Sequence, residues 1–412
     1  MIFYTEVQVG TPRVAFNVSI DTGSTARPRI RVCIVYGGRV SILISDYHVM
    51  VSFQDLLLPV AGCKGCKDGV VPFDPAASST YAPVKCANTT KQDCMTCANA
   101  VIPNQCAYSD SYLTCDKKNA SAICTVAGPV FSDVVQIGPW SAQAHLGGIS
   151  TQTTNFDQFK EIDGILGLAY RAEGFNDSPW AYVAAANAGA VADVIQHCLT
   201  TDGGVLVFGQ DAARDAAYYD GPLAWTPITW EAWYVVVADS MAVAGKVLPG
   251  INGTALNGPP KYPCIVDSGT NGLQLTPQAF AATVKAFKAR CGGGAGVMPG
   301  VCDVPTGAKG LFDGAAWPLK AADIATFPTV TITLKGDRGG APVPLTIGPE
   351  DYLIEYPKGQ FTMLITNGLC IVGNTHMLKY WTVYDRANSR IGFAPTNPGA
   401  CAAGRRRLLQ KV

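Results

Sequence analysis

Residues 18–25 read VSIDTGST, and the later residues 264–270 read CIVDSGT. In both stretches an apolar segment leads into Asp, a hydroxyl residue, Gly and a second hydroxyl residue. Each stretch is followed further along by two apolar residues and Gly, within DGILG at 163–167 and within LCIVG at 369–373. Because the same two elements occur twice in the same order, the sequence predicts two structurally similar lobes joined near residue 200.

The repeated loop combines groups that suit acid–base catalysis. In each copy the Gly permits a tight turn, and neighbouring hydroxyl and backbone N–H groups can donate to the carboxylate. Two facing carboxyls cannot easily both ionise, so a pair formed by Asp21 and Asp267 would share one proton at acidic pH. The ionised member can take a proton from water while the protonated member donates to a carbonyl oxygen. We therefore predict that Asp21 and Asp267 are catalytic without a metal or cofactor. The loop residues that would support them are Thr22, Gly23, Ser24, Ser268, Gly269 and Thr270.

At these residues the chain resembles the pepsin-like aspartic protease family. The resemblance extends from Phe3 to about Pro395, and further segments that carry it are 9–12, 163–168, 218–221 and 384–388. It implies a mostly β, bilobal acid protease fold in which a cleft separates two related barrel-like lobes. It also implies endopeptidase activity on extended polypeptides. Residues 267–270 and 391–394 look closer to the plant-type and β-secretase-like branches than to gastric pepsin.

The flap of this family is a β-hairpin whose Tyr closes over the substrate. Residues 106–112 resemble its plant-type pattern, which makes Tyr112 the flap candidate and Tyr108 the alternative. Either Tyr could instead be a buried strand residue. The chain departs from the family at residues 113–116, where LTCD replaces a glycine-rich turn, and at Leu57, where the family often has Trp. The first departure predicts a flap that is either stiffer or tied by Cys115, and the second removes a hydrogen bond from Trp to the flap Tyr.

The first lobe is longer than the second. Asp21 precedes Gly167 by 146 positions, whereas Asp267 precedes Gly373 by 106. We attribute much of the excess to residues 26–54, because removing these 29 residues yields the run DTGSTDLLLP and leaves 14 cysteines, an even number. Our hypothesis is that this segment is a lobe-specific insertion or an intron translated in frame. We accordingly expect an N-terminal lobe at 1–200 that contains it, a C-terminal lobe at 201–400 and a basic tail at 401–412.

Composition favours a turn-rich β protein, because the chain has 43 Gly and 27 Pro but only 15% charged residues. Short alternating or β-branched segments predict strands at 16–20, 205–208, 234–237, 330–334 and 381–384. Helical periodicity is confined to 277–291, which Thr276 would cap, and roughly 178–198.

Charge and hydropathy limit the partners. Lys+Arg and Asp+Glu are both 31, so the chain lacks the basic excess that nucleic acid binding requires. It has no run of 18 apolar residues, so we expect no membrane span. The family resemblance implies a polypeptide substrate as the partner, and we expect a monomer.

Fifteen cysteines indicate an oxidising compartment and disulfide bonds. Residues 63–66 and 94–97 are both C-x-x-C and admit a zinc-ribbon interpretation, but 27 residues separate them and no His pattern accompanies them. Sequence alone leaves the connectivity open. The resemblance implies two pairings: Cys198 with Cys401, and Cys302 with Cys370.

Five N-x-[ST] sequons also indicate a secretory route: Asn17, Asn88, Asn119, Asn176 and Asn252. We expect a glycoprotein that is secreted or resides in a vacuolar or lysosome-like compartment, although no signal peptide is visible in this chain.

Other classes of function compete with an acid-optimum aspartic endopeptidase. A non-catalytic pepsin-like binding or inhibitor protein would share the scaffold; the two intact Asp loops argue against it, and residues 26–54, Leu57 and the altered flap argue for it. A glycosidase would need two carboxyls about 5–9 Å apart, whereas paired loops predict closer contact. No G-x-S-x-G motif is present, which weakens a serine hydrolase. The histidines lack metal or triad spacing, so we expect them at the surface or in the core: His48, His145, His197 and His376.

Overall fold

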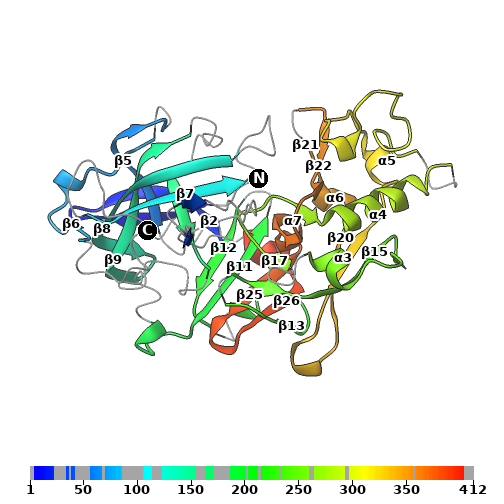
Figure 1. The fold of residues 1–412 in the computed structure, drawn as a ribbon. Helices are drawn as coiled ribbons and strands as arrows, with labels where there is room; N and C mark the ends of the chain where they lie inside the picture. Colours follow the sequence, from blue (N-terminus) through cyan, green and yellow to red (C-terminus); the bar gives the residue numbers. More distant parts are fainter. Residues whose placement is uncertain are drawn as a thin grey trace. The chain divides into compact units, whose positions relative to one another are not determined.

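The computed structural model describes residues 4–22, 34–36, 39–41, 56–66, 70–85, 105–113, 123–153, 163–169, 186–200, 203–211, 215–231, 233–258, 264–292, 297–355 and 358–402. The chain divides into two compact units, Tyr4–Ala188 and Gly189–Val412, the latter together with Met1–Phe3. Strands dominate both units and helices are few and mostly short (Figure 1). The predicted mostly β fold is therefore confirmed.

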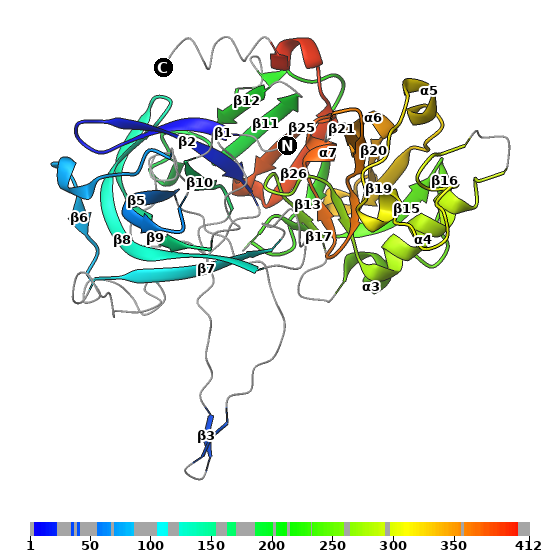
Figure 2. The same ribbon diagram turned by 90° about the horizontal axis from the view of Figure 1, so that it is seen from above.

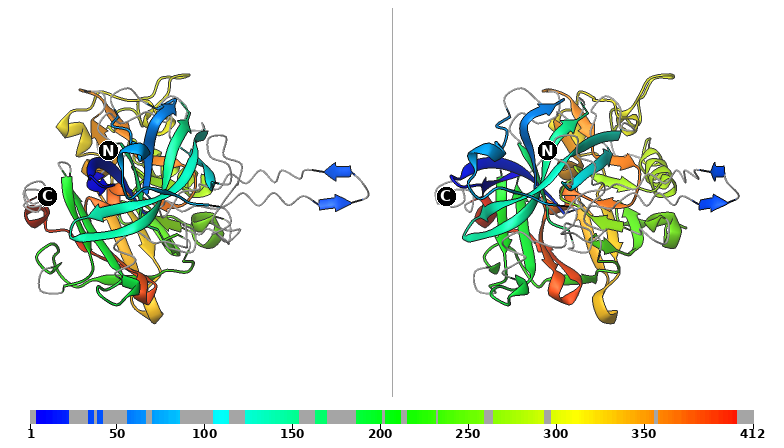
Figure 3. Two further views of the ribbon diagram at one scale, coloured as in Figure 1. Left: turned by 90° about the vertical axis from the view of Figure 1, so that its left-hand side faces the viewer. Right: turned by 60° about the vertical axis from the view of Figure 1, so that its left-hand side comes forward.

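The first unit is built on one eight-stranded sheet. Its order is β1-β2-β10-β5-β9-β8-β6, and β7 pairs with β8. An additional pairing of β1 with β8 joins the start of this order to its far side, so the sheet closes on itself. The long strands β8 and β9 are strongly curved (Figures 2 and 3). The strands are β1 (Tyr4–Val9), β2 (Val14–Asp21), β5 (Leu56–Lys64), β6 (Ala82–Pro83), β7 (Ala107–Leu113), β8 (Ile123–Ile137), β9 (Trp140–Gln152) and β10 (Gly164–Gly167).

Alternation along these strands forms the core of the first unit. From Val7 onward in β1 and from Phe16 onward in β2, every second residue is buried. Phe73 stacks on Phe131 of β8 with ring centroids 5.3 Å apart, and both rings are buried in the core. Burial of these side chains fixes the register of β2, and with it the position of Asp21 at the end of that strand.

The second unit contains three larger sheets. Their orders are β12-β11-β25-β26-β13, β14-β17-β24-β18-β23 and β16-β15-β19-β20. The first consists of β11 (Val194–Thr200), β12 (Gly203–Phe208), β13 (Ala224–Pro227), β25 (Tyr380–Asp385) and β26 (Arg390–Pro395). The second consists of β14 (Val235–Val236), β17 (Cys264–Val266), β18 (Leu273–Leu275), β23 (Ile365–Asn367) and β24 (Ile371–Val372). The third consists of β15 (Ala238–Val243), β16 (Lys246–Val247), β19 (Val330–Leu334) and β20 (Val343–Ile347). Two smaller hairpins are β21 (Leu353–Glu355) with β22 (Phe361–Met363), and β3 (Ile34–Tyr36) with β4 (Arg39–Ser41) in the first unit.

Helices of the second unit lie beside these sheets. They are α3 (Gly253–Asn257), α4 (Pro277–Lys288), α5 (Ala321–Ile324), α6 (Pro349–Tyr352) and α7 (Asn374–Met377). The predicted helix at 277–291 is confirmed as α4, and its N-cap Thr276 accepts a hydrogen bond from the Ala279 N–H at 3.3 Å. Within the part of the chain that the structure describes, no helix is long and apolar enough to cross a membrane.

The predicted helix at 178–198 is wrong at its C-terminal end. Residues 194–200 form β11, which pairs with β12 on one side and β25 on the other. Six of its seven residues are buried, so the strand lacks the alternation of a half-exposed strand. The apolar pairs 194–195 and 198–199 are four residues apart, and this spacing imitates a helical face.

Disulfide bonds connect distant parts of the second unit. Cys198 pairs with Cys401, as predicted. The predicted pairing of Cys302 with Cys370 is wrong: Cys302 pairs with Cys291 after α4, and Cys370 pairs with Cys264. The second of these bonds lies at the start of the paired strands β17 and β24. In the first unit Cys63 pairs with Cys66, which argues against a zinc site there.

Candidate active site

The first candidate loop begins where β2 ends at Asp21. This strand pairs in parallel with β10, so that Ile20 faces Leu166 and Asp21 faces Gly167. The Asp21 carbonyl accepts a hydrogen bond from the Leu168 N–H at 2.8 Å, which holds the strand end in place. Asp21 is half-buried, and Thr22 after it is fully buried. Gly23 and Ser24, also expected in this loop, lie outside the described residues.

The second candidate loop begins where β17 ends. Asp267 is 7% exposed, and its backbone N–H donates to the Val372 carbonyl at 3.0 Å. One carboxylate oxygen accepts from the Gly269 N–H at 2.7 Å, and the other accepts from the Thr270 hydroxyl at 2.6 Å. Donors aimed at both oxygens stabilise the negative charge and fix the orientation of the carboxylate. Ser268, beside it, is buried.

The two loops are framed by the same three-strand arrangement. In the first unit β10 lies between β2, its parallel neighbour, and β5, its antiparallel neighbour. In the second unit β24 lies in the same way between β17 and β18. The residue before each Asp faces the equivalent position: Ile20 faces Leu166, and Val266 faces Val372. The repeat seen in the sequence is therefore a repeat of strand pairing.

The glycine that ends the middle strand is required by close backbone contact. A Cβ at Gly373 would lie 2.3 Å from the carbonyl oxygens of both Gly272 and Thr270. The loop carrying Asp267 thus passes directly over Gly373, and a larger residue would push it away. The motif comparison alone does not point to Gly272, whose own Cβ would lie 2.1 Å from the Leu364 carbonyl oxygen.

The α7 helix supports this loop from behind. The Asn374 N–H donates to the Thr270 carbonyl at 2.8 Å, so the helix start and the candidate catalytic loop share a hydrogen bond. All four residues of α7 are buried. Burial, with a smaller contribution from the Lys379 charge, lowers the pKa of His376 to about 3. His376 is thus a neutral core residue, as expected for a histidine without metal or triad spacing.

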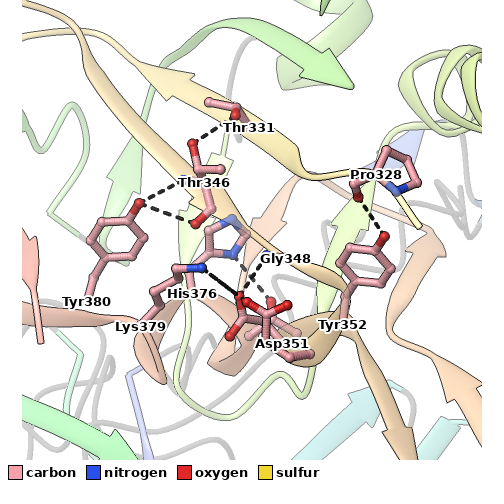
Figure 4. Close-up of polar contacts among 11 residues, drawn as sticks. Pro328, Thr331, Thr346, Gly348, Asp351, Tyr352, His376, Lys379 and Tyr380 are labelled. Atoms are coloured by element: carbon pink, nitrogen blue, oxygen red, sulfur yellow. Dashed lines mark hydrogen bonds and ion pairs between the residues drawn. The ribbon is translucent and has the colours of Figure 1, made fainter. Parts of the chain in front are cut away.

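Charged residues lie beyond α7. Figure 4 shows Lys379 reaching towards Asp351, and their Nζ and Oδ2 atoms are 3.2 Å apart. The same carboxylate accepts from the Gly348 N–H at 2.7 Å at the start of α6. Tyr352, at the end of α6, donates to the Pro328 carbonyl at 2.6 Å (Figure 4). These contacts link α6 to the segment just after α7 and to the segment just before β19.

The flap candidates lie on β7. Tyr108 is buried and belongs to a core cluster that also contains Leu57 and Val126. A Cβ at Gly147 would lie 2.5 Å from Leu57 Cδ2 and 2.8 Å from Tyr108 Cε1, which shows how tightly these side chains pack. Tyr108 is therefore a core residue. Tyr112 lies on the same strand opposite Cys124, and its side chain is outside the described residues.

A pocket of about 400 Å³ in the second unit does not contain Asp267. It is lined by residues of α3, by Thr276 and Pro277 at the start of α4, and by the 368–370 segment. Residues 368–370 of this lining lie just before the start of β24, whereas Asp267 lies just after the end of β17, the parallel neighbour of β24. The pocket is therefore separate from the candidate catalytic loop of that unit.

Comparison with known proteins agrees with this geometry. Residues 108–396 match the sequence model of the family described as Asp, eukaryotic aspartyl protease. The chain belongs to this aspartyl protease family. The matched range includes Asp267 and Tyr112 but begins after Asp21, so it does not cover the first candidate loop.

Several pepsins are similar to this aspartyl protease chain. Pepsin-3 of Oryctolagus cuniculus is 26% identical over 268 residues, which cover 64% of this chain and 61% of that protein. Pepsin A of Rhinolophus ferrumequinum is 26% identical over 338 residues, 78% of this chain and 76% of that protein. Pepsin A of Sus scrofa is 25% identical over 283 residues, 66% of this chain and 64% of that protein. The chain thus spans about three fifths to three quarters of the length of these relatives.

Proposed function

We propose that the protein is an aspartic endopeptidase in which Asp21 and Asp267 together activate a water molecule. The observation that carries this proposal is the equal placement of the two residues. The residue before each Asp is buried and lies opposite the residue that precedes the glycine of a parallel middle strand: Ile20 faces Leu166, and Val266 faces Val372. The hydrogen bonds to both oxygens of Asp267 support a carboxylate held ready for proton transfer.

The chemistry needs one proton shared by the two carboxyls. The ionised carboxylate takes a proton from water as the water oxygen attacks the peptide carbonyl carbon. The protonated carboxyl donates its proton to the carbonyl oxygen, which gives a neutral tetrahedral diol. The carboxyl that is now protonated donates one proton to the amide nitrogen, and the other carboxylate takes one proton from a diol hydroxyl; the C–N bond breaks, and the amine and the acid leave with one proton again held by the pair. Because the pair must hold one proton, we expect an acidic pH optimum.

The proposal extends to substrate and setting. The substrate is an extended polypeptide, Tyr112 gates the site, Thr22, Gly23, Ser24, Ser268, Gly269 and Thr270 support the carboxylates, and the enzyme acts as a monomer. Its compartment is oxidising, either secreted or vacuolar, which the disulfide bonds support. We take the lobes expected at 1–200 and 201–400 to be the units Tyr4–Ala188 and Gly189–Val412, whose division lies before β11, and we keep the basic tail at 401–412.

We further propose that the chain belongs to the plant-type or β-secretase-like branch. The sequence at 267–270 and 391–394 and the Cys198–Cys401 bond support this placement. The bonds Cys264–Cys370 and Cys291–Cys302 differ from the pairing of Cys302 with Cys370 that the β-secretase-like branch implies, so they do not support that alternative.

A second candidate function is a pepsin-like binding or inhibitor protein without activity. It is favoured by the position of residues 26–54, which follow Asp21 by only a few residues. The two candidates differ in a simple assay. Pepstatin-sensitive cleavage of a denatured protein at acidic pH, lost in Asp267→Ala, supports the protease; activity that survives Asp267→Ala overturns it, and no activity from a folded chain supports the binding protein.

A further inference from the structure

One N-glycosylation sequon occupies an exposed turn of the second unit. Asn252, Gly253 and Thr254 are all exposed, whereas Ile251 before them and Leu256 after them are buried. A Cβ at Gly253 would meet no heavy atom within 4 Å, so the space around the centre of the sequon is open. Two buried anchors thus hold a short, accessible loop at the start of α3.

The Asn252 side chain is not used by the fold. The residue is the N-cap of α3 with an extended backbone, yet its side chain makes no capping hydrogen bond. Asn and Ser at such positions usually cap the first helical N–H groups. The helix is held instead by Asn257, whose Nδ2 donates to the Ala238 carbonyl at 2.7 Å and whose Oδ1 accepts from the Ala238 N–H. Asn252 can therefore be modified without loss of a contact that holds α3.

The sequon at Asn17 has the opposite environment. Asn17 lies within β2, opposite Glu6 of β1. Its N–H donates to an Asp163 carboxylate oxygen at 2.8 Å, and its carbonyl accepts from the Asp163 N–H at 2.7 Å. Val18, the central residue of this sequon, is fully buried. This sequon is part of a closed sheet and provides an internal comparison for Asn252.

We propose that Asn252 is an N-glycosylation site of this protein. The amide nitrogen of Asn252 loses a proton and bonds to the anomeric carbon of an oligosaccharide, whose lipid pyrophosphate carrier leaves. This inference rests on the secretory setting of the proposed function. A signal peptide fused to the full chain directs it into the secretory pathway, so glycosylation of Asn252 can be tested without depending on the chain's own targeting or on its catalytic activity.

The experiment is expression of this fusion in a eukaryotic host, followed by peptide mapping after enzymatic deglycosylation in heavy-oxygen water. Peptide mapping should show Asn252 converted to labelled Asp. On a gel, Asn252→Gln and Thr254→Ala should each run faster than the unchanged chain, by the shift that one glycan causes. Thr254→Ser should keep the glycan because it preserves the sequon, and Asn17→Gln should leave the shift unchanged.

The variants also separate the modification from the chemistry. Asp267→Ala should retain the glycan at Asn252 and lose proteolysis, while Asn252→Gln should lose the glycan and retain whatever proteolysis the unchanged chain shows. A secreted chain with unmodified Asn252, or an unchanged mobility shift in Asn252→Gln, overturns the proposal.

Discussion

Leu56 in β5 and Leu273 in β18 hold the same place in the two units. Leu56 faces Leu166, which also faces Ile20, and Leu273 faces Val372, which also faces Val266. Ile20 and Val266 are the residues directly before the two candidate catalytic Asp residues. Yet Leu56 follows Asp21 by 35 positions and Leu273 follows Asp267 by six, a difference of 29.

This difference equals the length of residues 26–54, so strand register supports the hypothesis that this segment is an extra piece in the first loop. We predict that deleting residues 26–54 gives a folded chain. Once Thr25 is joined to Asp55, Leu56 follows Asp21 by six positions, as Leu273 follows Asp267. The deletion variant should match or exceed the full chain in kcat/KM on a denatured protein at acidic pH.

Two controls sharpen the deletion experiment. Asp267→Ala in the deleted background should abolish any activity gained, which ties that activity to the proposed site. Transcript sequencing separates the two versions of the hypothesis, since reads that all retain the segment as coding exclude the intron. A deleted chain that cannot fold would contradict both versions.

The Thr270 hydroxyl should contribute to catalysis through its 2.6 Å hydrogen bond to Asp267. A hydrogen bond to a charged group contributes roughly 1.5–3 kcal/mol, so Thr270→Val should lower kcat/KM about 10- to 100-fold. Thr270→Ser keeps a hydroxyl and should retain most activity. Steady-state kinetics across pH would test this, and equal activity of the Val and Ser variants would remove Thr270 from the mechanism.

Gly373→Ala should destabilise the second unit. Its Cβ would lie 2.3 Å from two carbonyl oxygens, so the backbone must move, which commonly costs about 1–3 kcal/mol or more. Thermal unfolding should show a clear fall in Tm and a loss of activity. Gly399→Ala is the matched control, because its Cβ would meet only an Asn397 oxygen at 3.6 Å. Equal Tm values for the two variants would contradict the close-packed loop.

The sequence predicted the repeated elements because their chemistry leaves few alternatives. Asp267 needs its donors, and Gly373 needs to lack a side chain, so both appear as a motif. The helix expected at 178–198 failed at β11 because that strand is covered on both faces, which removes the alternation that identifies strands. The predicted pairing of Cys302 with Cys370 is wrong because the chain after α4 brings Cys302 next to Cys291, and this placement cannot be read from the sequence.

The disulfide bonds provide a test of unequal stabilisation. Cys264 and Cys370 are 106 positions apart, whereas Cys291 and Cys302 are 11 apart. Chain-entropy arguments give about 4.8 kcal/mol for the longer loop and about 2.8 kcal/mol for the shorter. The double variant Cys264→Ala/Cys370→Ala should therefore unfold at lower denaturant than Cys291→Ala/Cys302→Ala. Peptide mapping without reduction checks the pairing, and a Cys302–Cys370 peptide would contradict it.

Two buried histidines should weaken the fold in acid. Burial lowers the pKa of His197 to about 4 and that of His376 to about 3, from an ordinary value of 6.5. The unfolded chain therefore binds more protons than the folded chain below pH 6.5, and stability falls as pH decreases towards these values. At about 1.4 kcal/mol per pKa unit, the loss approaches about 3 kcal/mol for His197 and about 5 kcal/mol for His376.

The variant His376→Gln removes the larger of these penalties. We expect it to lose less unfolding free energy than the unchanged chain when pH is lowered from 7 to 4, as measured by urea unfolding at both values. Comparing each protein with itself at pH 7 cancels the packing cost of the substitution. The Asn374 N–H in the same helix donates to the Thr270 carbonyl at 2.8 Å, so loss of structure around His376 in acid would also disturb the Thr270 loop. In this variant the pH below which kcat/KM falls should therefore be lower. Parallel pH dependence of stability in the two proteins would show that His376 does not remain neutral in the folded chain.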